Sequence, residues 1–144
     1  MIFQPPFQIL LVDDDPSIHE LIETYVTLRY AGDVDVVYRN TLQSAREYID
    51  NSKSVIHFAF CDIHLDDGRL AWDVIKECFI VEKGIQIVAL SADQTLITAI
   101  ESYNNGARYF LEKPIDKKEL YRVIDHCIEH LSYWHNLIKK RVDK

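Results

Sequence analysis

Short apolar runs alternate with stretches whose apolar residues stand three and four positions apart, over most of this chain. Apolar runs rich in β-branched and aromatic residues are typical of buried strands, and the three-and-four spacing is typical of amphipathic helices. The pattern predicts strands over residues 7–12, 34–38, 55–61, 85–90 and 108–111, and a helix after each of them.

The predicted helices begin at residues that commonly cap helices. Asp15, Thr41 and Asp93 suit the N-cap position, and Asp116 with Glu119 resembles a capping box at the start of the last helix. The apolar residues that mark the earlier helices are Ile18, Leu21, Ile22, Tyr25 and Leu28, then Leu42, Ala45, Tyr48 and Ile49, then Leu70, Val74, Ile75, Cys78 and Phe79, and finally Leu96, Ile97, Ile100 and Tyr103.

Helical connections between consecutive strands imply a parallel sheet with helices on both faces, which is an α/β fold. The run over residues 55–61 is apolar without strict alternation, as expected for a strand in the centre of such a sheet. A chain of 144 residues suits one domain with one core.

The last predicted helix, over residues 117–140, is longer than a small domain can cover. At 1.5 Å per residue it would span roughly 36 Å. Its apolar stripe continues through Trp134 and Ile138. We expect its second half to pair as a coiled coil or to lead into a further domain; the alternative is that it folds back on the domain.

Composition and charge exclude several classes of protein. The formal net charge of -7 argues against direct binding to nucleic acid, which needs a basic face. No apolar stretch is long enough to span a bilayer and residues 1–6 do not resemble a signal peptide, so we expect a cytoplasmic protein without membrane contact. Cys61, Cys78 and Cys127 are far apart and form no CxxC pair, so we expect reduced, buried thiols rather than a zinc site or a disulfide framework.

Polar residues follow four of the predicted strands at the point where each strand ends. Asp13 and Asp14 follow the first strand, Asp62 the third, Ser91 the fourth and Lys113 the fifth. Because the carboxyl ends of parallel strands lie at one edge of the sheet, we expect these side chains to meet there.

Three carboxylates in one pocket repel one another, and a divalent cation relieves that repulsion. An all-oxygen set of ligands suits Mg²⁺. With a lysine ammonium and a serine hydroxyl beside the metal, such a pocket can receive a phosphoryl group, because the positive charges neutralise its oxygens. A carboxylate is a competent nucleophile for that transfer and forms an acyl phosphate. The pattern therefore predicts Mg²⁺-dependent phosphoryl transfer to a carboxylate.

Four motifs together resemble the receiver domain of two-component response regulators. They are Leu11-Val12-Asp13-Asp14-Asp15, Asp62, Ser91-Ala92 and Lys113-Pro114, in this order and at these strand ends. The resemblance implies a flavodoxin-like (βα)5 fold of three layers with strand order 2-1-3-4-5. It also implies a receiver domain over residues 1–131, with a C-terminal helical extension over residues 132–144 that serves as a linker or a dimerisation helix.

By this resemblance Asp62 accepts the phosphoryl group and Lys113 contacts it. Asp13 and Asp14 hold Mg²⁺, Asp14 directly and Asp13 often through water, and Asp62 and the backbone carbonyl of His64 complete the protein's ligands to the metal. Such a chain catalyses only its own phosphorylation and dephosphorylation, so it is not expected to be an enzyme with an outside substrate.

The resemblance also implies residues that respond to the phosphoryl group. Ser91 moves toward it and Phe110 rotates inward as an aromatic switch; the alternatives are that Ser91 only caps a helix and that Phe110 is a plain core residue. His64 and Asp93 stand at two positions that often tune the phosphoryl lifetime, and we expect Asp93 or His64 to orient a hydrolytic water. The Lys113–Pro114 bond is expected to be cis.

The implied partners are a histidine kinase or a phosphotransfer protein that donates the phosphoryl group. A downstream output domain or a second copy would bind the face formed by the fourth helix, the fifth strand and the fifth helix. Two other functions stay open at this point. One is a receiver-like interaction module that takes no phosphate. The other is a haloacid-dehalogenase-like phosphatase in which Asp13 is the nucleophile, a reading that leaves Asp62 unexplained.

Overall fold

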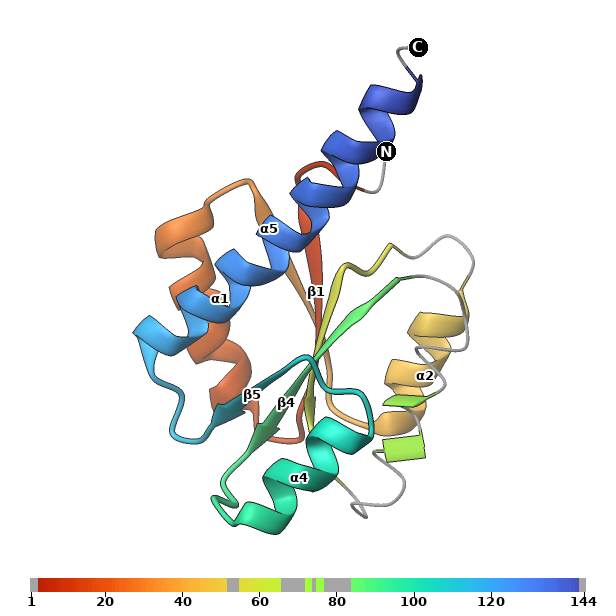
Figure 1. Cartoon of the computed structure of the whole chain (residues 1–144). Helices are drawn as coiled ribbons and strands as arrows, with labels where there is room; N and C mark the ends of the chain where they lie inside the picture. The colour runs from red at the N-terminus through yellow and green to blue at the C-terminus, as the bar shows by residue number, and fades with distance from the viewer. Residues whose placement is uncertain (1–2, 52–54, 66–71, 74, 77–83, 143–144) are drawn as a thin grey trace.

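The computed structural model describes residues 3–51, 55–65, 72–73, 75–76 and 84–142. Within these residues the chain forms one parallel sheet of five strands in the order β2-β1-β3-β4-β5, with helices on both faces (Figure 1). The predicted flavodoxin-like α/β fold and its strand order are therefore confirmed.

The elements alternate between strand and helix, as the apolar pattern predicts. Their bounds are β1 Phe7–Val12, α1 Pro16–Tyr30, β2 Val34–Arg39, α2 Leu42–Asp50, β3 Phe58–Asp62, β4 Gln86–Ser91, α4 Leu96–Asn104, β5 Tyr109–Glu112 and α5 Lys117–Val142. The predicted helix around residues 70–79 lies mostly outside the described residues, and so does Cys78; Cys61 and Cys127 are buried, as expected.

The sheet separates two apolar clusters, because successive side chains of a strand point to opposite faces. On β1, Phe7, Ile9 and Leu11 pack with α1 and α5, whereas Leu10 and Val12 pack with α2. Figure 1 shows α1 and α5 together on one side of the sheet and α2 on the other. All of these β1 side chains are buried, which explains why the central strands read as continuous apolar runs.

Strand β3 begins at Phe58, later than the predicted residue 55. The cause lies at His57, whose ring nitrogen Nδ1 accepts a hydrogen bond from the Gln8 backbone N–H at 2.8 Å, where a strand would offer a carbonyl. The main chain of His57 still bonds to the strands on both sides: its N–H donates to the Gln8 carbonyl at 2.9 Å, and its carbonyl accepts from the Gln86 N–H at 3.0 Å.

Three of the predicted helix caps are found and one is wrong. The side chains of Asp15, Thr41 and Asp116 accept hydrogen bonds from backbone N–H groups in the first turns of α1, α2 and α5. Helix α4 is capped by Thr95 instead of Asp93. Asp93 supports that cap from outside the helix by accepting the Thr95 N–H at 2.9 Å.

On α1 and α4, some or all of the apolar residues whose spacing marks the helix are exposed in the structure. On α1 the buried residues are Ile22, Val26 and Tyr30, whereas Leu28, one of the residues whose spacing marks the helix, is 70% exposed. On α4 the apolar residues that mark the helix all face solvent; they are Leu96, Ile97, Ile100 and Tyr103.

Helix α5 has 26 residues and reaches beyond the predicted end at residue 140. Its buried residues end at Leu131. The rest of the helix projects beyond the sheet (Figure 1). Tyr133 is 63% and Trp134 43% exposed, whereas Leu137 and Ile138 are half-buried. None of the described helices is long and apolar enough to cross a membrane.

A polar and aromatic cluster joins α1 to α5 where the two helices cover the sheet. The Tyr30 hydroxyl lies 2.6 Å from Asp125 Oδ1 and 3.1 Å from the Tyr121 carbonyl, and Arg29 pairs with Asp125 Oδ2 at 2.7 Å. Burial raises the pKa of Tyr30, and the hydrogen bond to Asp125 raises it further. The cluster therefore holds Tyr30 in its neutral, hydrogen-bonded form.

We predict that Tyr30→Phe lowers the free energy of unfolding by about 1–2 kcal/mol, because it removes a half-buried hydrogen bond to a charged group. The raised folded-state pKa means that this contribution is fully present below about pH 10 and is lost as pH rises further. Urea denaturation measures the difference. Tyr103→Phe, on a side chain that is 80% exposed, is the matched control; equal stability of the two variants would contradict the prediction.

Candidate functional site

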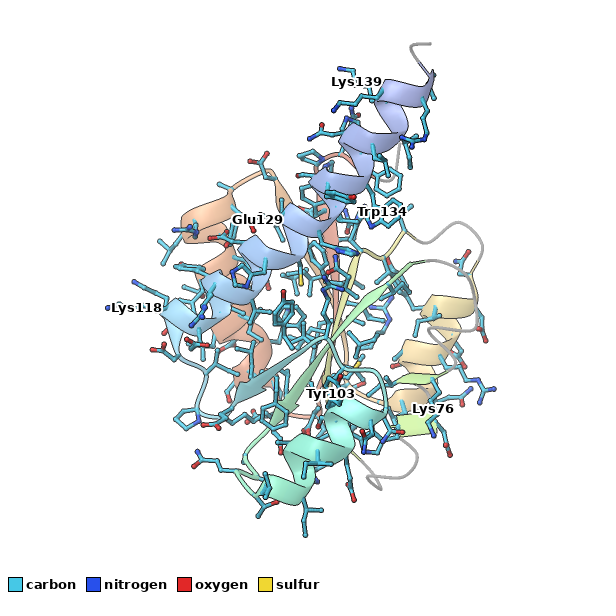
Figure 2. All side chains as sticks on the ribbon, in the orientation of Figure 1. Lys76, Tyr103, Lys118, Glu129, Trp134 and Lys139 are labelled. Carbon is cyan, nitrogen blue, oxygen red and sulfur yellow. The ribbon has the colours of Figure 1, made fainter. Side chains whose placement is uncertain are left out.

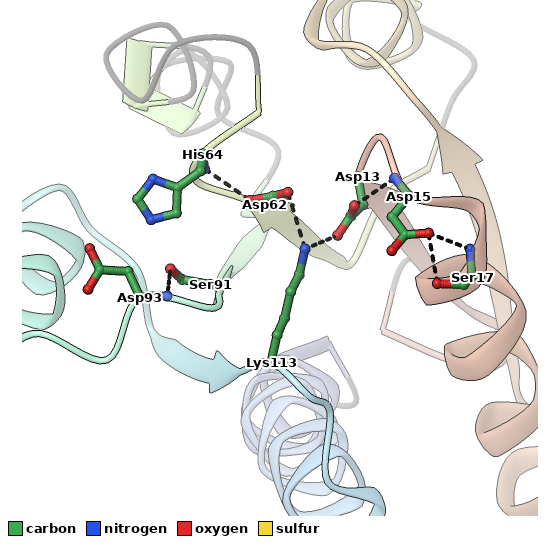
Figure 3. A network of polar contacts seen from close by, with 8 residues as sticks. All are labelled: Asp13, Asp15, Ser17, Asp62, His64, Ser91, Asp93 and Lys113. Carbon is green, nitrogen blue, oxygen red and sulfur yellow. Dashed lines mark hydrogen bonds and ion pairs between the residues drawn. The ribbon is translucent and has the colours of Figure 1, made fainter.

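The carboxyl ends of the central strands bring the predicted site residues to one edge of the sheet (Figure 3). Asp13 directly follows β1, Asp62 ends β3, and Ser91 ends β4. Lys113 directly follows β5, and its backbone N–H donates to the Ser91 carbonyl at 2.8 Å. The Lys113–Pro114 bond is cis, as predicted. The parallel register thus places side chains from four strands around one pocket.

Lys113 joins two of the carboxylates. Its Nζ lies 2.7 Å from Asp13 Oδ2 and 3.2 Å from Asp62 Oδ2. Burial alone would lower the pKa of Lys113, but the contacts with Asp13 and Asp62 outweigh that effect and raise it. The lysine is therefore a permanent positive charge in this pocket.

Asp13 is the most enclosed of the carboxylates. Its side chain is 0% exposed, and its Oδ1 accepts the Asp15 backbone N–H at 2.9 Å. Burial raises the pKa of Asp13 more than Lys113 and the Asp15 N–H lower it. The buried charge of Asp13 is therefore only partly compensated by the protein.

Asp62 is more accessible than Asp13, with 11% of its side chain exposed. Its Oδ1 accepts the His64 backbone N–H at 3.0 Å. This bond holds one carboxylate oxygen in place while the other faces Lys113 (Figure 3).

The three carboxylates could hold a divalent cation. One oxygen from each of Asp13, Asp14 and Asp62 lies within 4.8 Å of the others. Asp13 Oδ2 is buried and accepts no well-directed hydrogen bond from the described residues, although the Lys113 ammonium is in ion-pair range. An all-oxygen set with an under-satisfied buried oxygen is the donor set that Mg²⁺ prefers.

Ser91 and Asp93 lie on the other side of Asp62 and are held by their own loop. Ser91 is buried, and its Oγ accepts the Asp93 backbone N–H at 2.9 Å. The Asp93 carboxylate accepts from Thr98 Oγ1 at 2.7 Å and from the Thr95 N–H. These bonds lower the pKa of Asp93, and the nearby His64 lowers it slightly more. Among the described residues no hydrogen bond joins Ser91 to Asp62.

Phe110 is half-buried on β5 and packs against the cluster formed by β1, β3 and α2. It also lines a groove of about 510 Å³ between α4 and the start of α5. Asp13, Asp62, Ser91 and Lys113 were predicted from strand ends, and His64, Asp93 and Phe110 from the resemblance to receiver domains. Thr95 and Thr98 were missed. The signal was present as Asp93-x-Thr95-x-x-Thr98, a spacing that favours side-chain bonds at a helix start.

Residues 9–125 match the family model described as the response regulator receiver domain. The chain belongs to this family. The match disfavours the haloacid-dehalogenase-like alternative for this receiver domain.

The receiver domain is similar to curated regulators and to solved receiver structures. The transcriptional regulatory protein GlrR of Escherichia coli (strain K12) is 28% identical over 126 residues, which cover 86% of this chain and 27% of GlrR. A CheY-like receiver domain protein from Methanospirillum hungatei JF-1 superposes with a TM-score of 0.75 at 20% identity, over 88% of this chain and 97% of that one. A two-component response regulator from Clostridium difficile gives a TM-score of 0.73 at 19% identity, over 85% and 96%. This receiver domain spans about a quarter of the length of the curated relatives it first matches.

We predict that Asp13→Asn makes the metal-free receiver domain more stable at neutral pH. The pKa of Asp13 is raised above its usual 3.8 in the folded state. Folding therefore favours the protonated form, and that preference is lost as pH rises through the folded-state value. A neutral amide avoids the cost. The stability gain should be absent near pH 4, should grow by at most about 1.4 kcal/mol per pH unit above it, and should level off once the pH exceeds the folded-state pKa.

Asp15→Asn is the control for this measurement, since hydrogen bonds from Ser17 lower the pKa of Asp15. The ionised form of Asp15 stabilises the fold at pH values above its usual pKa of 3.8, and this contribution is lost as pH falls. Asp15→Asn should therefore be less stable than wild type at pH 7 and equally stable in acid. Urea denaturation in the presence of a metal chelator checks both signs. A loss of stability in Asp13→Asn at pH 7 would refute the prediction.

Proposed function

We propose that this receiver domain accepts a phosphoryl group on Asp62 in two-component signalling. The observation that supports it is the position of Lys113 between two carboxylates of unequal access. Asp13 has no exposed side-chain surface, whereas Asp62 is 11% exposed. A phosphodonor can therefore approach Asp62, while Asp13 is placed to hold charge behind it.

Asp13, Asp14 and Asp62, with the backbone carbonyl of His64, would hold Mg²⁺, which supplies positive charge to the transferring phosphoryl oxygens. An oxygen of Asp62 forms the new bond to phosphorus as the bond to the donor's leaving group breaks, so the product is an aspartyl phosphate. Lys113, whose Nζ lies 3.2 Å from Asp62 Oδ2, would bind a phosphoryl oxygen. The chain then transfers a group to itself and has no separate substrate of its own.

Phosphorylation would act on Ser91 and Phe110. Ser91 Oγ already accepts the Asp93 N–H, which leaves its hydroxyl hydrogen available for a phosphoryl oxygen after a small movement. Phe110 lies beside a groove that it could fill or vacate. Because Phe110 has no hydroxyl, any such switch must rest on packing alone.

The phosphodonor would be a histidine kinase or a phosphotransfer protein. GlrR is a transcriptional regulatory protein several times longer than this receiver domain. By analogy, residues 1–131 would receive the signal, and residues 132–144 would link to an output or contribute to dimerisation.

Intact-mass spectrometry with acetyl phosphate and Mg²⁺ tests the acceptor. We expect one phosphoryl adduct on wild type and on Asp50→Asn, an exposed control, and none on Asp62→Asn or after chelation of Mg²⁺. An adduct that persists in Asp62→Asn would contradict the proposal. If wild type forms no adduct and binds no beryllofluoride, the chain is an interaction module that takes no phosphate.

We predict that Asp93→Ala slows dephosphorylation by about 3- to 10-fold, less than the roughly 10²-fold loss of a full general base, because Asp93 would only orient the hydrolytic water. His64→Ala tests the other candidate. Thr98→Val is the matched control, since it removes the 2.7 Å hydrogen bond to Asp93 but keeps the carboxylate. Decay of the adduct is followed by intact mass after removal of the donor; an unchanged rate in Asp93→Ala rules out a role for Asp93.

A further inference from the structure

The hydroxyl of Tyr38, at the end of β2, is buried and has no hydrogen-bond partner among the described residues. The side chain as a whole is only half-buried, so its polar end is enclosed while part of its ring faces solvent. A buried hydroxyl without a partner costs free energy that a hydrogen bond would recover. The position of this hydroxyl therefore indicates a polar partner that the described side chains do not supply.

The strand register places Tyr38 on the same side of the sheet as Asp13. Tyr38 pairs with Leu11 in the β1–β2 ladder, and the Asp13 N–H continues that ladder by donating to the Arg39 carbonyl at 3.2 Å. Asp13 stands two residues after Leu11, and side chains two apart on a strand point to the same face. Leu11 and Tyr38 both pack in the apolar cluster on the α1 side of the sheet. The side chain of Asp13 therefore lies on that side as well, next to Tyr38.

The first turns of α1 hold the Tyr38 ring in place. The ring of His19 stacks on it, with 4.4 Å between the ring centroids and 6° between the ring planes. His19 is itself fixed by Glu23, whose Oε2 lies 2.8 Å from His19 Nε2. Figure 3 shows Asp13 and Asp15 on the turn that joins β1 to α1. Since Tyr38 contacts the elements on both sides of this turn, its hydroxyl is held beside the acidic residues.

The negative charge of this turn acts on the hydroxyl. Burial raises the pKa of Tyr38 most, and the charges of Asp13, Asp14 and Asp15 raise it further, so the hydroxyl is neutral at neutral pH. Asp13 Oδ2 is likewise buried without a well-directed hydrogen bond from the described residues. Two buried polar atoms beside the candidate metal ligands can be satisfied together by one small polar molecule.

We propose that Tyr38 is a positioning residue for the metal site, and that its hydroxyl binds a water in the coordination shell of Mg²⁺. A metal-bound water has two O–H donors, so Asp13 Oδ2 can accept one and the Tyr38 hydroxyl oxygen the other. Hydrogen bonds of this kind orient the ligands of a metal and strengthen its binding. The inference rests on the proposed function, because it needs the Mg²⁺ that the three carboxylates would hold.

A titration of the whole chain with Mg²⁺, followed by two-dimensional amide NMR, tests this role. Tyr38→Phe removes the hydroxyl and keeps the ring that stacks on His19. We expect the variant to bind Mg²⁺ about tenfold more weakly than wild type, which is the usual effect of losing an outer hydrogen bond at a metal site. The titration uses Mg²⁺ alone and no phosphodonor, so its result does not depend on phosphorylation of Asp62.

The stability of the metal-free chain separates a positioning role from a structural one. The Tyr38 hydroxyl makes no hydrogen bond to the described residues, so Tyr38→Phe should be at least as stable as wild type in urea with a metal chelator. A hydroxyl that only supports the fold would give the reverse result, which is a loss of stability with unchanged affinity for Mg²⁺.

Two other tyrosines serve as controls. Tyr109 is half-buried on β5, at the opposite edge of the sheet from β2, and packs against the same apolar cluster as Tyr38. Tyr103 is exposed on α4 (Figure 2). Tyr109→Phe and Tyr103→Phe should both bind Mg²⁺ as tightly as wild type.

Three outcomes would overturn the inference. Equal affinity of wild type and Tyr38→Phe for Mg²⁺ would show that the hydroxyl does not bind the metal's water, and would leave the proposed function unaffected. An equally large loss of affinity in Tyr109→Phe would assign the effect to packing. A wild-type chain that binds no Mg²⁺ would remove the metal site itself, and with it both the inference and the proposed function.

Discussion

The ion pairs of Lys113 with Asp13 and Asp62 are the interaction on which the site depends. Two carboxylates this close, one of them fully buried, would repel each other in the absence of a cation. The lysine supplies one positive charge at 2.7 and 3.2 Å, and the raised pKa of Asp13 shows that it does not fully compensate the buried negative charge. The pocket is therefore ready for further positive charge, which a divalent cation would provide.

The sheet makes this arrangement possible. Parallel strands with buried faces end together, so residues that are far apart in sequence meet without any local motif. The loop after each strand then fixes the side chains by short-range bonds: the Asp15 N–H holds Asp13, the His64 N–H holds Asp62, and the Asp93 N–H holds Ser91. A rigid scaffold with exposed ends is what phosphoryl transfer requires, because its catalysis is mostly positioning.

Much of this was predictable from the sequence, because buried strands end abruptly at polar residues and the resemblance to receiver domains supplied the strand order. Other features depend on packing that the sequence does not specify. Asp93 and Thr95 both suit an N-cap. In the folded chain Thr95 accepts the Thr98 backbone N–H, while Asp93 accepts the Thr95 N–H and the Thr98 hydroxyl. On α1, Ile22, Val26 and Tyr30 pack in the cluster formed with the sheet and α5, and Leu28 is left exposed. On α4 the apolar spacing predicted the helix correctly but could not show which side faces solvent.

The most direct test is to locate the acyl phosphate by residue. After reaction with acetyl phosphate and Mg²⁺, borohydride reduces an aspartyl phosphate to homoserine, and peptide sequencing by mass spectrometry finds the converted position. Our account predicts homoserine at Asp62 and nowhere else. Homoserine at Asp13 or Asp14 would contradict it, because the carboxylates assigned to the metal would then be the nucleophile.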